Sequence, residues 1–439
     1  MTEWEREPDG LAPTSARSLV VCPELPGRGR GTLLRNREGR LAETVGLASA
    51  INLTIVDSFA LPVRRVRPAT LIGTGQLAEL AELVAAETIE LVVLDTQLSP
   101  VQQRNLERGL KAKVIDRTAL ILEIFGERAR TAEGRLQVEL AHLDYQAGRL
   151  VRSWTHLERQ RGGFGFLGGP GETQIEADRR MIRDRMARLR RDLEEVRRTR
   201  SLHRDQRERA PWPVVALVGY TNAGKSTRFN RMTGSDVMAE DLLFATLDPT
   251  MREIALPGVA KVILADTVGF VSDLPTELVA AFRATLEEVV AADLIVHVRD
   301  IAHPDSDTQR NDVLKVLAQL GVDPELEDGV PVVEAWNKLD LLDEEAAQAV
   351  ASEAARHPGV VTPLSAKSGE GVDALSELMA ARLTAGNTVH RVQVNAGDGA
   401  SLAWLYDRGE VLDRAVADDG SLALSVRLSD ADWSRFSAR

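Results

Sequence analysis

The segment Gly219–Ser226, with the sequence GYTNAGKS, places the strongest constraint on how this chain folds. It matches the phosphate-loop pattern GxxxxGK[ST], follows the apolar run Val214–Val218 and precedes the helix-like run Thr227–Met232. The glycines let backbone N–H groups approach phosphates, and the N-terminus of the following helix adds positive potential. These features predict a nucleotide-binding domain. We expect Lys225 to reach the β- and γ-phosphates and the Ser226 hydroxyl to ligate Mg²⁺.

Two downstream segments are expected to respond to the γ-phosphate. In the motif Asp266-Thr-Val-Gly269, which closes an apolar run, Asp266 is expected to hold a Mg²⁺-bound water and the Gly269 N–H to contact the phosphate. Thr246, within Phe244-Ala-Thr-Leu-Asp248, is the natural second hydroxyl ligand of Mg²⁺ once GTP orders that loop. The alternative is an ordinary surface threonine.

The residue after Gly269 is Phe270, where many GTPases place the glutamine that orients the attacking water. Phenylalanine cannot orient water, so we expect slow basal hydrolysis that depends on help from outside this loop. Asn222 offers a side-chain oxygen beside the phosphates and could help to hold K⁺; the alternative is that it only stabilises the loop. A docking partner that reorders the switch loops is another source of help.

Two motifs indicate the base. Asn337-Lys-Leu-Asp340 follows an apolar run that ends at Trp336, and a buried Asp340 carboxylate would accept from guanine N1–H and the exocyclic amine. Adenine has no donor at N1, so the carboxylate would be left unpaired. Ser365-Ala-Lys367 ends the next apolar run, where a backbone N–H can bind guanine O6. In isolation NKLD is equally consistent with a solvated turn, but behind a phosphate loop it favours guanine.

Together these motifs define the candidate site for GTP or GDP and Mg²⁺. The residues expected to act in catalysis are Lys225, Thr246, Gly269 and Asn222, and the expected metal ligands are Ser226, Thr246 and, through water, Asp266. The nucleotide-binding residues are Gly219, Tyr220, Thr221, Asn222, Ala223, Gly224, Lys225, Ser226, Thr227, Phe244, Ala245, Thr246, Leu247, Asp248, Asp266, Thr267, Val268, Gly269, Asn337, Lys338, Leu339, Asp340, Ser365, Ala366 and Lys367.

A chain of 439 residues predicts several domains. Apolar runs separated by helical patterns predict an α/β fold with a doubly wound, mainly parallel sheet around the phosphate loop. The expected parts are a flexible tail (1–35), an N-terminal α/β domain (36–130), a coiled-coil helical hairpin (131–210), the nucleotide-binding domain (211–385) and a small α+β C-terminal module (386–439).

The hairpin is predicted from two heptad-like seams on either side of Gly162–Gly171, a segment with six glycines in ten residues. Residues 149–209 hold 17 Arg against 10 Asp and Glu, although the whole chain has a net charge of -12. Phe164, Phe166 and Leu167 at the tip suit base stacking, and the arginines suit phosphates, so RNA contact is favoured over a solvated coiled coil.

Composition excludes several other classes of protein. The single cysteine, Cys22, excludes a disulfide framework and suits the cytoplasm. No uncharged apolar stretch is long enough for a membrane helix, and the acidic start MTEWEREPDG does not fit a signal peptide. We expect a monomeric cytoplasmic protein without membrane insertion.

The chain resembles the HflX-type GTPases of the Obg–HflX group from about residue 40 to 385. The more specific signatures lie outside the GTPase motifs. They are SPVQQRNLE (99–107), VIDRT (114–118), ARTAEGRLQVELAHLDY (129–145), WTHLERQRGGFGFLGGPGETQIEADRR (154–180) and DLPTELVAAFRATLEEV (273–289).

The resemblance implies a GTP-dependent factor that binds the large (50S) ribosomal subunit and separates stalled or stressed 70S ribosomes. It implies that the hairpin tip, 162–171, approaches 23S rRNA and that the ribosome stimulates hydrolysis. It also places Asn222 where a potassium-assisted subset carries its asparagine. The alternatives are an RNA-remodelling NTPase whose N-terminal region also handles a nucleotide, and a nucleotide-dependent scaffold with negligible turnover.

Two arginines depart from the family pattern. Arg228 replaces a leucine after GKST and should face the sheet, so it must reach solvent, meet a carboxylate or weaken nucleotide binding. Arg299 replaces an apolar strand residue, which predicts either an edge strand or an acidic neighbour.

Overall fold

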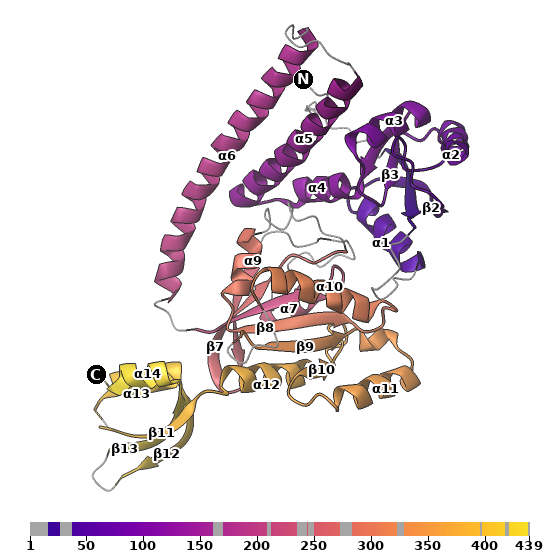
Figure 1. Ribbon diagram of the computed structural model, residues 1–439. Coiled ribbons are helices and arrows are strands. Elements are labelled where there is room, and N and C mark those ends of the chain that lie inside the picture. Colours follow the sequence, from indigo (N-terminus) through magenta and orange to yellow (C-terminus); the bar gives the residue numbers. More distant parts are fainter. Residues whose placement is uncertain are drawn as a thin grey trace, which may run out of the picture. The chain divides into compact units, whose positions relative to one another are not determined.

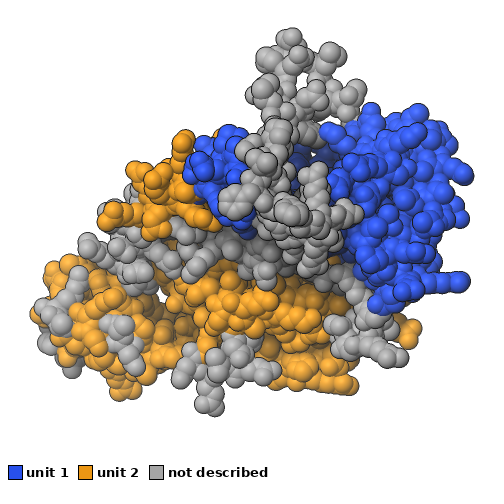
Figure 2. Space-filling view, turned by 45° about the horizontal axis from the view of Figure 1, so that its top comes forward, with its two compact units in different colours: residues 1–127, 142–186 blue, residues 128–141, 187–439 orange. Residues whose placement is uncertain are grey.

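The computed structural model describes residues 16–26, 37–160, 170–208, 212–234, 244, 250–272, 283–322, 329–395, 397–417 and 421–437. They belong to two compact units (Figures 1 and 2). The first unit contains residues 1–127 and 142–186, and the second contains 128–141 and 187–439. No helix in the described part of the chain is both long and apolar enough to cross a membrane.

The first unit is built on a four-stranded parallel sheet in the order β2-β1-β3-β4. Its strands are β1 (Arg17–Glu24), β2 (Thr54–Pro62), β3 (Leu91–Leu94) and β4 (Lys113–Asp116). Its helices are α1 (Arg37–Ser49), α2 (Thr74–Ala86), α3 (Pro100–Leu110) and α4 (Arg117–Arg128). The N-terminal α/β fold is therefore confirmed.

Strand β1 corrects the prediction of a flexible tail over residues 1–35. It lies in the interior of the sheet, between β2 and β3, and Leu19, Val20 and Val21 are fully buried. A strand covered on both faces has a continuous apolar run instead of an alternating one. The residues around this short run are rich in Pro, Gly and Arg, so composition indicated a flexible tail. That prediction was wrong for residues 17–24.

Helix α3 begins as its sequence predicts. The Ser99 hydroxyl accepts from the Gln102 N–H at 3.2 Å, and the Gln102 side chain accepts from the Ser99 N–H at 2.9 Å. This reciprocal capping box satisfies two N–H groups that the first helical turn leaves without partners. Pro100 at the first helical position needs no such partner.

Two long helices follow, α5 (Ala132–Gln160) and α6 (Pro170–Glu208). At a rise of about 1.5 Å per residue, their 29 and 39 residues measure about 44 Å and 59 Å. On α6, Met186, Leu189 and Leu193 belong to the second predicted seam, and they are buried. On α5, Leu136, Leu140 and Leu143 of the first predicted seam are less buried than Val138 and Ala141, so the buried face there is shifted from the prediction.

Asp116 joins α5 to the four-stranded sheet within the first unit. Its carboxylate, at the end of β4, accepts from the Tyr145 hydroxyl at 2.8 Å and from Arg149 Nη2 at 2.6 Å. Arg149 also donates to Gln103 of α3. Asp116 lies in the signature VIDRT and Tyr145 in AHLDY. Two motifs far apart in sequence therefore build one joint.

The second unit contains a six-stranded sheet in the order β10-β9-β8-β5-β7-β6, in which β6 alone is antiparallel to its neighbour. Its strands are β5 (Val214–Gly219), β6 (Thr250–Leu256), β7 (Val259–Asp266), β8 (Leu294–Asp300), β9 (Val332–Asn337) and β10 (Val361–Pro363). The described helices are α7 (Lys225–Thr233), α9 (Arg283–Val290), α10 (Ser306–Gln319), η1 (Leu339–Leu341), α11 (Glu344–Ala354) and α12 (Val372–Leu383).

Helices cover both faces of this sheet, with α10 and α12 on opposite sides in Figure 1. Phe229 of α7 and Leu375 and Met379 of α12 pack in one apolar cluster with the central strands. The predicted doubly wound, mainly parallel sheet is confirmed.

Arg299 lies on β8, an interior strand, so an acidic neighbour and not an edge accommodates it. Its guanidinium donates to Glu334 of β9 at 2.8 Å and to Asp307 of α10 at 2.6 Å. Trp336 Nε1 and Arg310 also donate to Glu334. Burial alone would raise the pKa of Glu334, but the attraction of Arg299 outweighs it and lowers the pKa to about 2.

The chain ends in a small module with an antiparallel sheet in the order β11-β13-β12. Its elements are β11 (Thr388–Val394), α13 (Gly399–Arg408), β12 (Glu410–Val416), β13 (Leu422–Leu428) and α14 (Asp430–Ser437). Alternate residues of β13 are buried with Leu405 of α13, as the period of a half-buried strand requires. The predicted α+β module is confirmed.

Candidate functional site

The site lies at the carboxyl ends of β5, β7 and β9, where doubly wound sheets bind ligands. The loop between β5 and α7 depends on glycine at two positions. Gly219 has φ +151, and a Cβ there would lie 2.2 Å from the Val298 carbonyl oxygen. Gly224 has φ +95, and its Cβ would lie 2.2 Å from Asn337 Nδ2. A side chain at either position would therefore push the loop off the sheet or off the base-binding motif.

Lys225 begins α7 with its ammonium group buried under this loop. The Nζ atom donates to the carbonyl oxygens of Gly219 at 3.1 Å and Tyr220 at 2.8 Å. Burial lowers the pKa of Lys225 to about 8, although the nearby Asp266 carboxylate opposes this shift. A desolvated cation at the phosphate loop attracts a phosphate more strongly than an exposed lysine would.

Ser226 and Asp266 meet as the expected metal ligands. The Ser226 hydroxyl donates to Asp266 Oδ2 at 2.8 Å, and Asp266 is fully buried at the end of β7. A hydroxyl and a carboxylate are the hard oxygen ligands that Mg²⁺ takes, with phosphates and waters completing its octahedron. Among the described residues, no group of three or more His, Cys, Asp or Glu side chains is arranged to hold a metal ion.

Gly269 packs directly against the phosphate loop. A Cβ on Gly269 would lie 2.8 Å from Thr221 Cγ2 and 3.0 Å from Lys225 Nζ. The next residue continues this contact through its backbone, because Phe270 N–H donates to Gly219 O at 3.1 Å and Phe270 O accepts from Thr221 N–H at 2.8 Å. The Phe270 side chain is 1% exposed and points into the core. It offers no polar group to an attacking water.

Asn337 ties the phosphate loop to the two base-binding motifs. Its Nδ2 donates to Ala223 O at 2.7 Å, and its Oδ1 accepts from the Ala366 N–H at 2.8 Å. Lys338 follows with φ +72, and its Nζ lies 2.8 Å from Asp300 Oδ2 at the end of β8. Asp300 was not among the predicted site residues. Its position directly after an apolar strand, at the same edge of the sheet, was the available signal.

Asp340 meets Ser365 across the base-binding region. The Ser365 hydroxyl donates to Asp340 Oδ1 at 2.5 Å, and Ser365 is fully buried. Asp340 itself is exposed, which corrects the expectation of a buried carboxylate. The penalty for an unpaired carboxylate therefore applies only when a base covers it.

Some predicted residues lie outside the described part of the chain, namely Ala245, Thr246, Leu247, Asp248 and the segment 162–169 with Phe164, Phe166 and Leu167. Phe244 is described and buried. Asn222 is exposed on the phosphate loop with φ +58, a left-handed conformation that asparagine tolerates. Both proposed roles of Asn222 therefore remain predictions.

Arg228 is the residue for which the sequence could not decide between three possible environments. It is fully buried on α7, and none of its three guanidinium nitrogens has a hydrogen-bond partner among the described residues. Burial lowers its pKa to about 10. Arg228 does not reach solvent, and no carboxylate of the described residues pairs with it, so the remaining expectation is a cost to this helix and to nucleotide binding.

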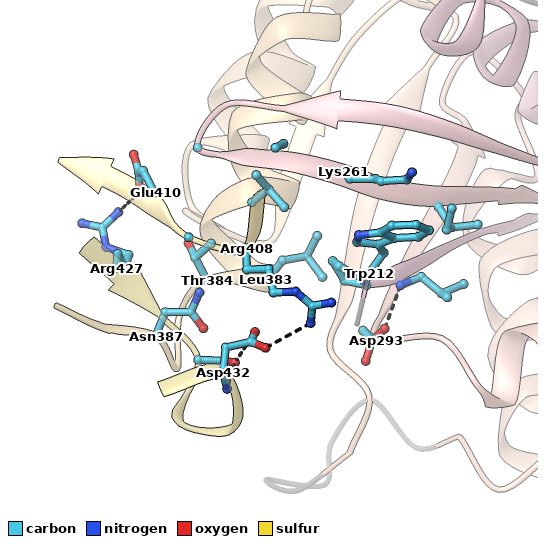
Figure 3. A pocket seen from close by; sticks show the side chains of 18 of the residues that line it. Trp212, Lys261, Asp293, Leu383, Thr384, Asn387, Arg408, Glu410, Arg427 and Asp432 are labelled. Carbon is cyan, nitrogen blue, oxygen red and sulfur yellow. Dashed lines mark hydrogen bonds and ion pairs between the residues drawn. The ribbon is translucent and has the colours of Figure 1, made fainter. Parts of the chain in front are cut away.

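A hollow of about 720 Å³ lies away from the phosphate loop, between the six-stranded sheet and the C-terminal module (Figure 3). Its cations are already paired: Arg427 lies 2.6 Å from Glu410, and Lys261 lies 3.5 Å from the centre of the Trp212 ring. The turn at Gly258, between β6 and β7, also lines it. This hollow contains none of the predicted site residues.

Family models match four consecutive parts of the chain. They are described as GTP-binding GTPase N-terminal (residues 38–126), GTP-binding GTPase Middle Region (128–207), 50S ribosome-binding GTPase (214–338) and HflX C-terminal domain (349–439).

Among relatives, the chain is 48% identical to GTPase HflX of Magnetococcus marinus over 394 residues, which cover 89% of this chain and 88% of that protein. It is 42% identical to GTPase HflX of Escherichia coli, covering 90% and 91%. A solved GTP-binding protein of Sulfolobus solfataricus in complex with GDP aligns with 84% of this chain and 99% of its own at 22% identity and a TM-score of 0.44. The relatives match almost the whole length of this chain, and the chain belongs to the HflX family of GTPases.

Proposed function

We propose that this GTPase binds the large ribosomal subunit in a GTP-dependent manner and separates stalled or stressed 70S ribosomes. The observation that carries the proposal is the exposed basic face of α6. Residues 179–191 contain seven Arg and one Asp, and their buried positions are Met186 and Leu189. A stiff helix with this charge suits contact with the phosphates of ribosomal RNA.

The nucleotide site supplies the switch in this proposal. Lys225 and the loop amides bind the β- and γ-phosphates, and the Gly269 N–H reports whether the γ-phosphate is present. Asn337, Asp340 and the loop that begins at Ser365 select guanine. Loss of the γ-phosphate releases the segment that contains Thr246, and the hairpin changes its pose on the subunit.

Mg²⁺ fits the oxygen donors of Ser226 and Asp266, with Thr246 as the proposed third residue. When bound, it neutralises charge on the β- and γ-phosphates during transfer. The buried Phe270 leaves the attacking water without a side-chain partner, so we propose that the ribosome, and K⁺ near Asn222, supply the missing help. Equal hydrolysis rates in K⁺ and Na⁺ buffers would remove the potassium part of this proposal.

Sedimentation with 50S subunits tests the proposal directly. We expect co-sedimentation with a non-hydrolysable GTP analogue, little with GDP, and a turnover rate that rises when 50S or 70S particles are added. Deletion of residues 162–171 should abolish 70S separation while basal GTP hydrolysis persists. Failure to bind large subunits in any nucleotide state would refute the ribosomal function but not the guanine site.

The alternative of an RNA-remodelling NTPase makes a different prediction. A second nucleotide site in the N-terminal domain would preserve ATP hydrolysis after Lys225→Ala. A measurement of ATP hydrolysis by Lys225→Ala therefore separates the two functions.

A further inference from the structure

Arg231, in the last turn of α7, reaches across to the base-binding loop Ser365–Gly369. Its Nη1 donates to the carbonyl oxygens of Ala366 at 3.2 Å and Lys367 at 3.1 Å, and its Nη2 donates to that of Ser368 at 2.7 Å. We propose that Arg231 is a positioning residue for guanine recognition, although it lies too far along α7 to belong to the phosphate loop.

The loop is shaped to receive this side chain. Gly369 has φ +98, and a Cβ there would lie 2.5 Å from Arg231 Nη2. Only glycine combines this backbone conformation with so close an approach. The planar guanidinium presents donors on two nitrogens in fixed directions, so Nη1 and Nη2 together hold three successive carbonyls. A lysine carries all its donors on one nitrogen, which cannot occupy both positions.

Fixing the carbonyls also fixes the amides. In a trans peptide the C=O and the following N–H point in opposite directions in one plane. Holding the oxygens of Ala366 and Lys367 on the α7 side therefore sets the directions of the next two N–H groups. Of these, the Lys367 N–H belongs to the motif that is proposed to bind guanine O6, whereas the Ser368 N–H donates to Ser365 Oγ.

The same contact reaches the Asp340 carboxylate. Ser368 N–H donates to Ser365 Oγ at 3.0 Å, which leaves that hydroxyl to donate to Asp340 Oδ1 at 2.5 Å. Arg231 thus supports both expected contacts with the base, the amide at O6 and the carboxylate at N1 and the exocyclic amine. Because α7 begins at Lys225, one helix connects the phosphate end of the site with the base end.

This inference rests on the proposed guanine site, and the test is a cycle of two proteins and two ligands. GDP carries the exocyclic amine that Asp340 is expected to bind, whereas inosine diphosphate lacks it. For Arg231→Ala we expect GDP affinity to fall about tenfold. We also expect the preference for GDP over inosine diphosphate to shrink by about fivefold, since a loosened loop no longer holds Asp340.

The matched control is Arg382→Ala. Arg382 is also an exposed arginine that donates to a loop carbonyl of the same sheet domain, that of Gly359 at 2.7 Å. This variant should lose a similar amount of thermal stability and keep the ligand preference of the parent protein. Arg231→Lys should recover only part of the preference, because the single nitrogen of lysine cannot occupy both the Nη1 and the Nη2 positions.

An unchanged preference in Arg231→Ala, or an equal loss in Arg382→Ala, would overturn the positioning role. Asp340→Asn tests the underlying site separately. An asparagine amide can donate to the O2 of xanthine, so that variant should gain xanthosine diphosphate binding. If it does not, the proposed guanine site itself is wrong; if it does and Arg231→Ala has no effect, only the role of Arg231 fails.

Discussion

The four-stranded and the six-stranded sheet differ at the edge where the carboxyl ends of their parallel strands lie. In the first unit, Asp95 after β3 and Asp116 at the end of β4 are covered by the chain's own cations. Arg40 and Arg117 pair with Asp95 at 2.5 Å and 2.6 Å, and Arg149 pairs with Asp116 at 2.6 Å. In the second unit, the same edge presents loop amides, Lys225 and the Ser226–Asp266 pair.

Doubly wound sheets bind ligands at this edge, and the two sheets differ in the groups that line it. Burial alone would raise the pKa of Asp95, but Arg117 and Arg40 outweigh it and hold the pKa below its usual range. Asp95 is thus a charged, internally neutralised group. The edge of the N-terminal sheet is closed by ion pairs, and the edge of the six-stranded sheet is arranged for a phosphate.

The largest expected effect follows from removing the phosphate-binding cation. Lys225→Ala should lower GTP turnover by about a thousandfold, because Lys225 supplies buried positive charge to the transferring phosphoryl group. Single-turnover phosphate release measures it, with Lys315→Ala, an exposed substitution on α10, as the control. ATP hydrolysis that survives Lys225→Ala would break the comparison, since it would place a nucleotide at the other sheet.

Asp95→Asn should destabilise the first unit by about 3–5 kcal/mol, because Arg40 and Arg117 would lose a buried counter-charge. Urea denaturation measures this loss. The control is Glu87→Gln, which removes the exposed partner of Arg17 and should cost less than about 1 kcal/mol. Equal, small losses in both variants would mean that the closed edge contributes no more than a surface ion pair.

Acid should weaken the second unit through His297, which is 1% exposed on β8. Burial lowers the pKa of His297 to about 3; Glu334 opposes the shift, whereas Arg299, Arg310 and Lys225 reinforce it.

The unfolded chain binds a proton at its ordinary pKa near 6.5 and the folded protein does not. The stability that the uncharged His297 contributes is therefore fully present above about pH 6.5. The free energy of unfolding falls by about 2 kcal/mol on acidification to pH 4.5. The denaturation midpoint should depend less on pH in His297→Gln, whereas His357→Gln, an exposed control, should keep the pH dependence of the parent protein. An unchanged slope in His297→Gln would contradict the assignment.

The smallest expected effect is that of Arg228→Leu, which we contrast with the loss of a second buried arginine, Arg299. Arg228→Leu should stabilise the protein by about 1–2 kcal/mol, because it removes an unpaired guanidinium. Arg299→Leu should destabilise it by about 3 kcal/mol, since the buried Glu334 would lose its buried cation and keep only the more exposed Arg310. Thermal unfolding of both variants measures the contrast, and a loss of stability in Arg228→Leu would indicate a partner beyond the described residues.

Much of this architecture could be predicted because periodicity and motif order are local signals. The strands around the phosphate loop, the capped start of α3 and the seam of α6 all follow from residues within one or two turns of each other. Strand β1 could not be recognised, because its few apolar residues form a strand only when β1 pairs with β2 and β3 in the sheet.

The same limit applies within the site. The order of the motifs placed Asn337 among the nucleotide-binding residues. Its hydrogen bond to Ala223 O, the exposure of Asp340 and the burial of Arg228 without a partner among the described residues depend on how distant segments pack. Arg231 carries no motif signal at all; its role becomes visible only when the loop at Ser365 folds against α7.

The joint at Asp116 bears on how this chain can be recombined. A chimera that exchanges residues 38–126 for a distant homologue, but keeps its own α5, would pair Tyr145 and Arg149 with a foreign β4. Unless the replacement brings an aspartate to the same place, a half-buried guanidinium loses its counter-charge. The N-terminal sheet and α5 should therefore be exchanged together in any such chimera.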